Sequence, residues 1–316
     1  RRSAILSFLS SFCETDDEAY PFIYLMIRVY IPLDHGVVPV ESQEQGDRMS
    51  VAKSVLLVSP RRCESLPVEV HQGFLNLLES VISQFGHKIE GYIPCFMAIL
   101  LAIASAYEIQ DVALQETDEQ KGVENEIDEN SGNILRAGSI RSLCYRRLSE
   151  LLSHFAETHD FSPYAKSLWR ALQKSLPLLP AMAYNSDRAP ALLVLLETIS
   201  GERQLINLIS KYGSCVPQVV MCLSARSKPA VVDSTMNFID NLLYDDGGNR
   251  ECGRQLLKQN IHLILSQFRE RLLGTPVADL RCATRHFGGL TQGKGTWQRE
   301  LEMLCRMSDF VDDSNQ

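Results

Sequence analysis

Apolar residues recur with a helical period along most of the chain, and residues 212–243 show the pattern in its simplest form. Two apolar stripes in this stretch follow the i, i+3, i+4, i+7 spacing that places side chains on one helix face. Pro217 and Pro229 stand where the first helical turns would begin, a position that tolerates a missing N–H. The pattern predicts two short helices folded back on each other around a polar hinge at 224–228. The stripes are Val216, Val219, Val220 and Leu223, then Val231, Val232, Met236, Ile239, Leu242 and Leu243.

A helix pair of this size cannot bury its apolar faces alone and needs similar pairs stacked on both sides. Comparable apolar segments recur about every 35–50 residues, which is the spacing expected of HEAT-like repeats. No succession of alternating strands with glycine-rich turns is present, and this argues against an α/β enzyme fold. We therefore predict an all-α fold, a HEAT/armadillo-like α-solenoid of stacked antiparallel helix pairs. Proteins of this class usually hold other molecules instead of transforming them.

Interruptions of the helical pattern divide the chain into five predicted parts. Residues 1–115 and 133–273 are predicted to form α-solenoid helical repeats. Residues 116–132 lie between them, without aromatic residues or an apolar period and with many acids, which favours a disordered insertion. Residues 274–296 are rich in glycine and are predicted to form a linker. The last part, residues 297–310, is predicted to form a terminal amphipathic helix.

The acidic insertion also accounts for most of the charge of the chain. The 316 residues include 31 basic and 39 acidic side chains, for a formal net charge of −8. Seven of these acids lie in 116–132 beside a single lysine, so the remaining chain is nearly neutral and its charge selects no class of partner. We interpret the insertion either as a solvated spacer or as a contact for a basic partner.

The cysteines and the hydropathy of the chain argue against a secreted disulfide-linked protein and against a membrane span. Nine cysteines are spread through the apolar segments without a C-x-x-C pair, and we predict free thiols that pack as small hydrophobic side chains. An odd number without a framework argues against a secreted disulfide scaffold. The longest uncharged run, 91–107, is shorter than the roughly 18–20 apolar residues of a membrane span, and it contains Pro94. We predict a helix buried on most sides there, and no membrane contact.

Motifs that would support catalysis are incomplete. Residues 288–296 (GGLTQGKGT) approach the P-loop pattern G-x-x-x-x-G-K-[ST], but Gly295 stands where a hydroxyl should bind magnesium. The residues before this motif are too polar for the buried strand that precedes a P-loop, so a glycine linker is favoured over a nucleotide site. The seven histidines form neither an H-E-x-x-H motif nor a zinc-ligand spacing with cysteine. We predict no catalysis, no cofactor, no metal and no small-molecule substrate.

Five arginines are the candidate contacts for RNA or a partner protein. Arg141 is expected to share a helix face with Tyr145, and such an Arg/Tyr surface suits RNA phosphates and bases. The alternative is a solvated helix edge that balances the neighbouring acidic insertion. The candidates are Arg61 and Arg62 in a predicted loop, and Arg141, Arg146 and Arg147 on a predicted helix.

Three segments of the chain resemble one known family. The middle one, IRSLCYRRLSELLSHFAETHDFSPYAKSLWRAL (140–172), carries most of the similarity, with an I-R-x-L-C-x-R-R-L-like helix and then a D-F-S-P-Y-like turn. The others are HKIEGYIPCFMAILLAI (87–103) and ISKYGSCVPQVVMCLSARSKPAVVDSTMNFIDNLL (209–243), the latter with a K-P-A-V-V helix entry. These segments are similar to the very large HEAT-repeat scaffold of the small-subunit processome, the down-regulated-in-metastasis family associated with a small nucleolar RNA.

The resemblance implies a nucleolar scaffold that supports pre-rRNA processing in early 40S ribosome assembly. Its implied partners are preribosomal proteins and pre-rRNA or small nucleolar RNA within a large complex, and the family offers no catalytic residues. Members of the family are several times longer, and this sequence does not begin with Met, so we expect it to be an internal segment of a longer protein. The alternative is a HEAT-type protein-binding adaptor in another process, such as transport or signalling-complex assembly.

Overall fold

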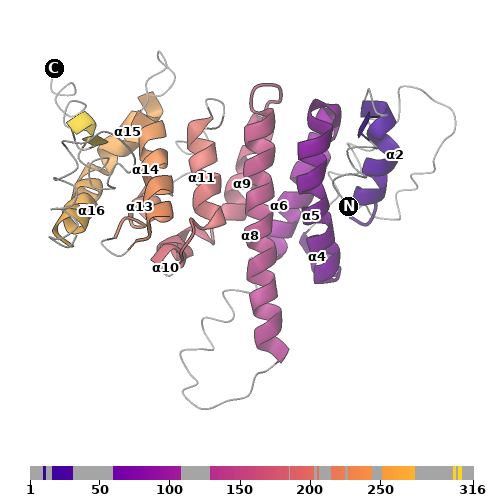
Figure 1. The fold of residues 1–316 in the computed structure, drawn as a ribbon, viewed down its shortest axis with the longest axis horizontal. Helices are drawn as coiled ribbons and strands as arrows, with labels where there is room; N and C mark the ends of the chain where they lie inside the picture. Colours follow the sequence, from indigo (N-terminus) through magenta and orange to yellow (C-terminus); the bar gives the residue numbers. More distant parts are fainter. Residues whose placement is uncertain are drawn as a thin grey trace, which may run out of the picture. The chain divides into compact units, whose positions relative to one another are not determined.

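A computed structural model shows a chain of helices that divides into two compact units, unit 1 (residues 1–172) and unit 2 (residues 173–316). Over the described residues every regular element is a helix and no strand occurs (Figure 1). The predicted all-α fold is therefore confirmed for this part of the chain, while the stacking of helix pairs into a solenoid stays a prediction. The structure describes residues 10–11, 16–30, 60–107, 129–184, 186–202, 205, 215–224, 227–243, 251–274, 302–303 and 305–307.

Unit 1 is built around two long helices and the apolar helix between them in sequence. Helix α5 packs against α8, and α6 packs against α4, α8 and α9. The predicted break between Gly86 and Gly91 is the 3-10 segment η1, and Gly86 enters it with φ of 53°, a left-handed conformation that favours glycine. The elements of unit 1 are α2 (Asp16–Ile27), α4 (Pro60–Glu64), α5 (Val68–Phe85), η1 (Gly86–Tyr92), α6 (Ile93–Ala106), α8 (Glu129–Phe155), η2 (Ser162–Tyr164) and α9 (Ala165–Leu172).

Helix α6 forms the core of unit 1. Of its 14 residues, 11 are buried, and Pro94 lies in its first turn, where no backbone bond is lost. The stretch Val68–Ala106 is long and apolar enough to cross a membrane by composition, but 72% of its most apolar window is buried inside the protein. The prediction of a helix buried on most sides is thus confirmed.

Unit 2 contains the two helices predicted over 212–243, but they do not have the predicted packing. Both apolar stripes are buried, apart from a half-buried Leu243. Helix α14 packs mainly against α11, whereas α13 packs against α10 and α16. The elements of unit 2 are η3 (Leu176–Leu178), α10 (Leu179–Tyr184), α11 (Ala191–Gly201), α13 (Cys215–Val220), α14 (Pro229–Leu243), α15 (Glu251–Gln259) and α16 (Ile261–Gly274).

The physical reason for this correction is length. Helix α13 has six residues and α14 has 15, so they span roughly 9 Å and 22 Å at 1.5 Å per residue. A helix as short as α13 cannot cover the apolar face of α14. Helix α11, with 11 residues, offers a longer apolar face and takes the place that the sequence pattern assigned to α13.

Most described cysteines behave as small hydrophobic side chains. Six cysteines have described side chains, and all six are free thiols, five of them buried and one, Cys305, exposed. Burial raises the pKa of Cys95, Cys215 and Cys222 to about 12, so these thiols stay protonated and unreactive at neutral pH. The predicted packing as free thiols is confirmed for the five buried residues, which are Cys63, Cys95, Cys144, Cys215 and Cys222.

Several predicted parts lie outside the described residues. They include most of the acidic insertion, the P-loop-like motif at 288–296 and the linker beyond Gly274. Helix α8 begins at Glu129, before the apolar period resumes. The predicted boundaries of the five parts therefore stay predictions.

Candidate interaction surfaces

The five predicted arginines lie in different surroundings within unit 1. Arg61 and Arg62 are on α4, a five-residue helix where the sequence predicted a loop, and the other three are on α8. Arg61 and Arg146 are exposed and Arg62 is half-buried. Arg141 and Arg147 are buried, with exposures of 6% and 4%. Only part of the predicted set therefore presents cations to solvent, and its role in binding stays a prediction.

The predicted Arg/Tyr face of α8 points into unit 1. Arg141 and Tyr145 are one turn apart as expected, but Tyr145 is only 1% exposed. Both residues lie on the same stripe as the buried Cys144 and Leu148, at the i, i+3, i+4, i+7 spacing of a core face. A base cannot stack on a covered ring, so an RNA contact through this pair would require α8 to separate from its neighbours.

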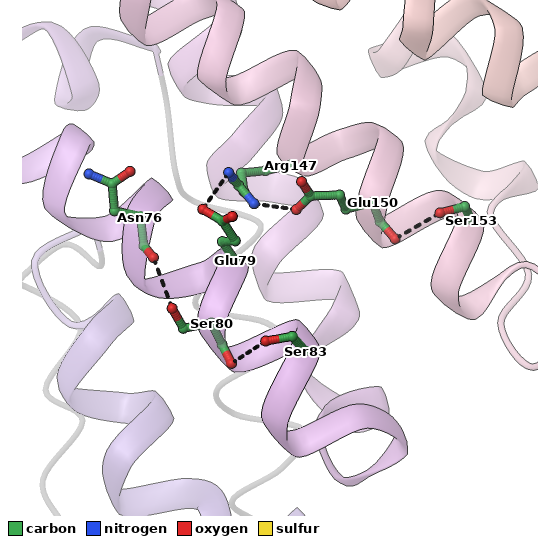
Figure 2. A network of polar contacts seen from close by, with 7 residues as sticks. All are labelled: Asn76, Glu79, Ser80, Ser83, Arg147, Glu150 and Ser153. Atoms are coloured by element: carbon green, nitrogen blue, oxygen red, sulfur yellow. Dashed lines mark hydrogen bonds and ion pairs between the residues drawn. The ribbon is translucent and has the colours of Figure 1, made fainter. Parts of the chain in front are cut away.

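Arg147 connects α8 to α5 through a polar network (Figure 2). Its Nη2 donates to Oε2 of Glu79 on α5 at 2.7 Å, and its Nη1 donates to Oε2 of Glu150 on α8. The two carboxylates are about half exposed, whereas the arginine is covered. A buried cation is costly unless it is paired, and here two carboxylates offset that cost. Arg147 thus holds the two longest helices of unit 1 together.

Burial and two neighbouring charges determine the pKa of Glu150. Burial raises the pKa of this carboxyl, the Arg147 guanidinium lowers it, and the negative charge of Glu79 raises it again. The three serines in Figure 2 donate only to carbonyls of their own helices, such as Ser83 Oγ to Ser80 O at 3.1 Å. The link between α5 and α8 therefore depends on Arg147 and its two carboxylates.

A second polar cluster, which the sequence analysis missed, surrounds His71 on α5. Its Nε2 lies 2.9 Å from the Cys63 carbonyl oxygen, and its Nδ1 lies 3.0 Å from the Tyr30 hydroxyl. Because a carbonyl only accepts, Nε2 carries the proton and Nδ1 accepts from Tyr30. The Tyr107 ring stands edge-on to the imidazole, with 5.5 Å between centroids. One neutral histidine thus joins the turn after α2 to α4, α5 and the end of α6.

Burial lowers the pKa of His71, which favours this neutral form. The residue occupies the buried stripe of α5 with Phe74, Leu75 and Leu78. Its position on that stripe is the signal that could have identified it from the sequence. A histidine on an apolar face needs polar partners inside the fold, and His71 has them.

In unit 2, Glu197 plays the corresponding part between α11 and α14. The hydroxyl of Ser234 donates to its Oε2, and Asn237 Nδ2 donates to its Oε1 at 2.6 Å. Asn241 Nδ2 adds a bond to Ser200 Oγ at 3.0 Å. A Cβ at Gly201 would lie 3.3 Å from this same Asn241 nitrogen, so a larger residue there would require the Asn241 side chain to shift by a few tenths of an ångström. These contacts hold the pair together, and the Ser234 hydroxyl beside the Glu197 carboxylate is buried between the two helices, with an exposure of 4%.

Within the described ranges, no group of three or more His, Cys, Asp or Glu side chains is arranged to hold a metal ion. The polar clusters described above consist of ion pairs and hydrogen bonds between helices. The described surface offers contact area and charge, with exposed charged side chains of both signs and six exposed large hydrophobic side chains, one of them the aromatic Tyr184.

Comparison with known proteins places the chain in a family. No curated protein matches it. The family model described as "U3 small nucleolar RNA-associated protein 20, N-terminal" matches residues 1–316, which is the whole chain. The resemblance carried by the three sequence segments is confirmed by this match. The chain therefore belongs to the family of the N-terminal part of U3 small nucleolar RNA-associated protein 20.

Proposed function

We propose that this chain is a non-catalytic scaffold that supports pre-rRNA processing and 40S ribosome assembly through contacts with proteins and RNA. Membership in the family implies a role in the small-subunit processome and ribosome biogenesis. The observation that carries the proposal is the extent of the family match, which covers both units from end to end. Each unit is thereby linked to the same complex.

The construction of the units supports a binding role. The helix pairs α5–α8 and α11–α14 are fixed by polar contacts that use the charged side chains for packing. The family is that of a processome component and is not a known enzyme family. We propose that the helix pairs stack as an α-solenoid, which would present long continuous surfaces to several partners at once.

The family also implies association with a large RNA–protein complex and a nucleolar location. Among the predicted contacts, we propose the two exposed arginines as direct contacts, Arg146 for RNA phosphates and Arg61 for a partner protein. Arg62 is half-buried, and Arg141 and Arg147 are covered in unit 1, so these three would act mainly by positioning α4 and α8.

Purification of the complex tests the proposal. The full-length protein containing this chain, tagged and isolated from nuclear extract, should bring down pre-rRNA, U3 small nucleolar RNA and processome subunits. Nuclease treatment before elution separates partners held by RNA from partners held by protein. Recovery of none of these components, or a location outside the nucleolus, would overturn the scaffold assignment.

A further inference from the structure

An exposed patch at the end of α2 combines aliphatic and cationic side chains. Leu25 is 58% exposed and Val29 is 37% exposed, although both are large apolar residues. The Arg28 amide still donates to the Tyr24 carbonyl at 2.9 Å, so the helical register continues beyond Ile27. Leu25, Arg28 and Val29 are therefore neighbours on one side of the helix, at i, i+3 and i+4. Two aliphatic side chains and one cation point to solvent together.

Helix α4 brings further arginines to this place. Arg62 Nη2 donates to the Val29 carbonyl oxygen at 3.3 Å, which puts the start of α4 beside the end of α2. Arg61 and Arg28 are exposed, and the acidic side chain nearest to them on α4 is the exposed Glu64. We call Leu25, Arg28, Val29, Arg61 and Arg62 the α2–α4 patch. The patch contains three arginines and no acidic residue, and its arginines outnumber the two acids recorded as exposed on α2 and α4, Glu18 and Glu64.

The α2–α4 patch is held on a fixed base. Tyr30, the residue after Val29, is fully buried and hydrogen-bonded to His71. His71 also holds the Cys63 carbonyl, one residue after Arg62. The two segments that carry the patch are therefore fixed to the same side chain of α5. A binding surface on fixed segments loses little conformational entropy when a partner docks.

We propose that the α2–α4 patch binds an acidic amphipathic segment of a partner protein. Aliphatic side chains of that segment would cover Leu25 and Val29 and remove their surface from water. Its carboxylates would pair with Arg28 and Arg61, since the planar guanidinium matches a carboxylate with two parallel bonds, while Arg62 holds α4 against the end of α2. This inference rests on the proposed function, because it assigns one of the protein contacts of the scaffold.

The exposed apolar side chains of the patch favour a protein segment over RNA. A base can stack on a guanidinium plane, but Leu25 and Val29 are aliphatic and offer a base no ring to stack on. A phosphate backbone would satisfy the arginines but would leave Leu25 in water. An amphipathic acidic segment satisfies both the charge and the apolar surface, and this complementarity decides the choice of partner.

Photocrosslinking in the full-length protein tests the inference. Benzoylphenylalanine replaces Leu25 in one variant and Ser167, an exposed residue of α9 in the same unit, in the control. We expect at least five times more protein crosslink at position 25, to a peptide that has Asp or Glu within one helical turn of aliphatic residues. A yield equal to that of the control, or a crosslink to RNA, to another region of the same protein or to a peptide without acids, would overturn it.

Charge reversal provides a second arm. Arg28→Glu with Arg61→Glu, added to the position-25 variant, should lower the crosslink at least fivefold with unchanged helical content by circular dichroism. Arg188→Glu, an exposed arginine of unit 2, is the matched control and should leave the yield unchanged. A yield that survives the double reversal contradicts the proposal. If processome components still copurify with the wild-type protein while the patch captures nothing, only this inference fails.

Discussion

In the two units, the polar contacts between the main helix pairs have opposite arrangements of charge. Between α5 and α8 a buried cation, Arg147, faces two partly exposed carboxylates. Between α11 and α14 a partly buried anion, Glu197, faces the neutral donors Ser234 and Asn237. In unit 1 the buried group is the charged arginine, and the carboxylates that pair with it are partly exposed to solvent. In unit 2 the charged group lies at the edge and its partners carry no charge.

This difference separates arginines that hold the fold together from arginines available to a partner. Arg147 and Arg146 are neighbours in sequence, but one is buried in the helix contact and the other is exposed. A charged residue on an apolar stripe is committed to packing, and a charged residue off the stripe remains free to bind. The experiments below test that distinction, beginning with the largest expected effect.

The largest effect is expected from a charge in the core of unit 2. Val232→Asp places an unpaired carboxylate at a position of α14 that is 1% exposed, and should destabilise unit 2 by about 3–5 kcal/mol. Limited proteolysis of the whole chain should then cut first in unit 2 and spare unit 1. The matched control is Ala230→Asp, at an exposed position in the first turn of the same helix. Unaltered melting of Val232→Asp would mean that this face is not core.

A smaller loss of stability is expected when Arg147 stays buried but its two carboxylate partners lose their charge. Glu79→Gln with Glu150→Gln leaves a covered cation without a counter-charge and should cost about 3 kcal/mol, since broken buried pairs cost 3–5 and these carboxylates are partly solvated. Arg147→Met removes the cation itself and should cost less, because an apolar side chain fills the same space. Denaturant unfolding of unit 1 measures both. A larger loss for Arg147→Met would show that the ion pair itself supplies the stability.

The sequence pattern predicts where helices form better than it predicts which helices pack against each other. The apolar stripe of α14 and the buried helix α6 are predicted correctly because burial imposes the helical period on each segment alone. The α13–α14 pairing is wrong because pairing depends on helix length and on side chains of α11 that lie far away in sequence. His71 and Arg147 lie on buried faces of their helices, and each has a partner on a segment distant in sequence, so their roles become visible only in the structure.

For the same reason the α2–α4 patch could not be found from the sequence. Arg61 and Arg62 were predicted contacts, whereas Arg28 and Leu25 lie more than 30 residues earlier on another helix. The bond from Arg62 to the Val29 carbonyl joins the two segments, and no local pattern encodes it. Exposure of a large apolar side chain is likewise a property of the fold and not of the residue.

The polar contacts of the two helix pairs should also differ in how much stability is lost when a carboxylate is replaced by an uncharged amide. Glu197→Gln keeps an acceptor for Asn237 and removes only the charge, so unit 2 should lose about 1 kcal/mol. This is well below the loss predicted for the double substitution at Glu79 and Glu150. Thermal unfolding followed by circular dichroism compares the two variants. Equal losses of stability in Glu197→Gln and in the double variant would contradict the idea that a buried cation depends more on its counter-charge than a partly exposed anion does.

Acid should weaken unit 1 through His71. Burial lowers the pKa of His71 in the folded protein below the ordinary value of 6.5, so the unfolded chain binds this proton more readily. The stability that depends on neutral His71 is therefore complete above about pH 6.5 and is lost as the pH falls towards the folded pKa. His159, whose pKa is also lowered by burial, acts in the same direction. Unfolding measured from pH 7.5 to 5 should show this slope.

A His71→Gln variant isolates the contribution of that residue. Glutamine does not titrate, so the variant should be less stable at pH 7.5 but should show a flatter dependence on pH. The difference between the two curves reports His71 alone, because all other titrating groups are shared. Parallel curves for the two proteins would assign the acid sensitivity of unit 1 to other groups.

The smallest effect on stability, and the most informative for RNA binding, is expected at the exposed Arg146. Arg146→Gln should change the free energy of unfolding by less than about 0.5 kcal/mol, since this side chain is exposed. Crosslinking of the full-length protein to pre-rRNA should nevertheless fall at least twofold if this cation contacts a phosphate. Arg170→Gln, an exposed arginine of α9, serves as the control for loss of charge alone. Unchanged crosslinking would make Arg146 a solvated position at the edge of α8 and would move the search for the RNA contact to other surfaces of the chain.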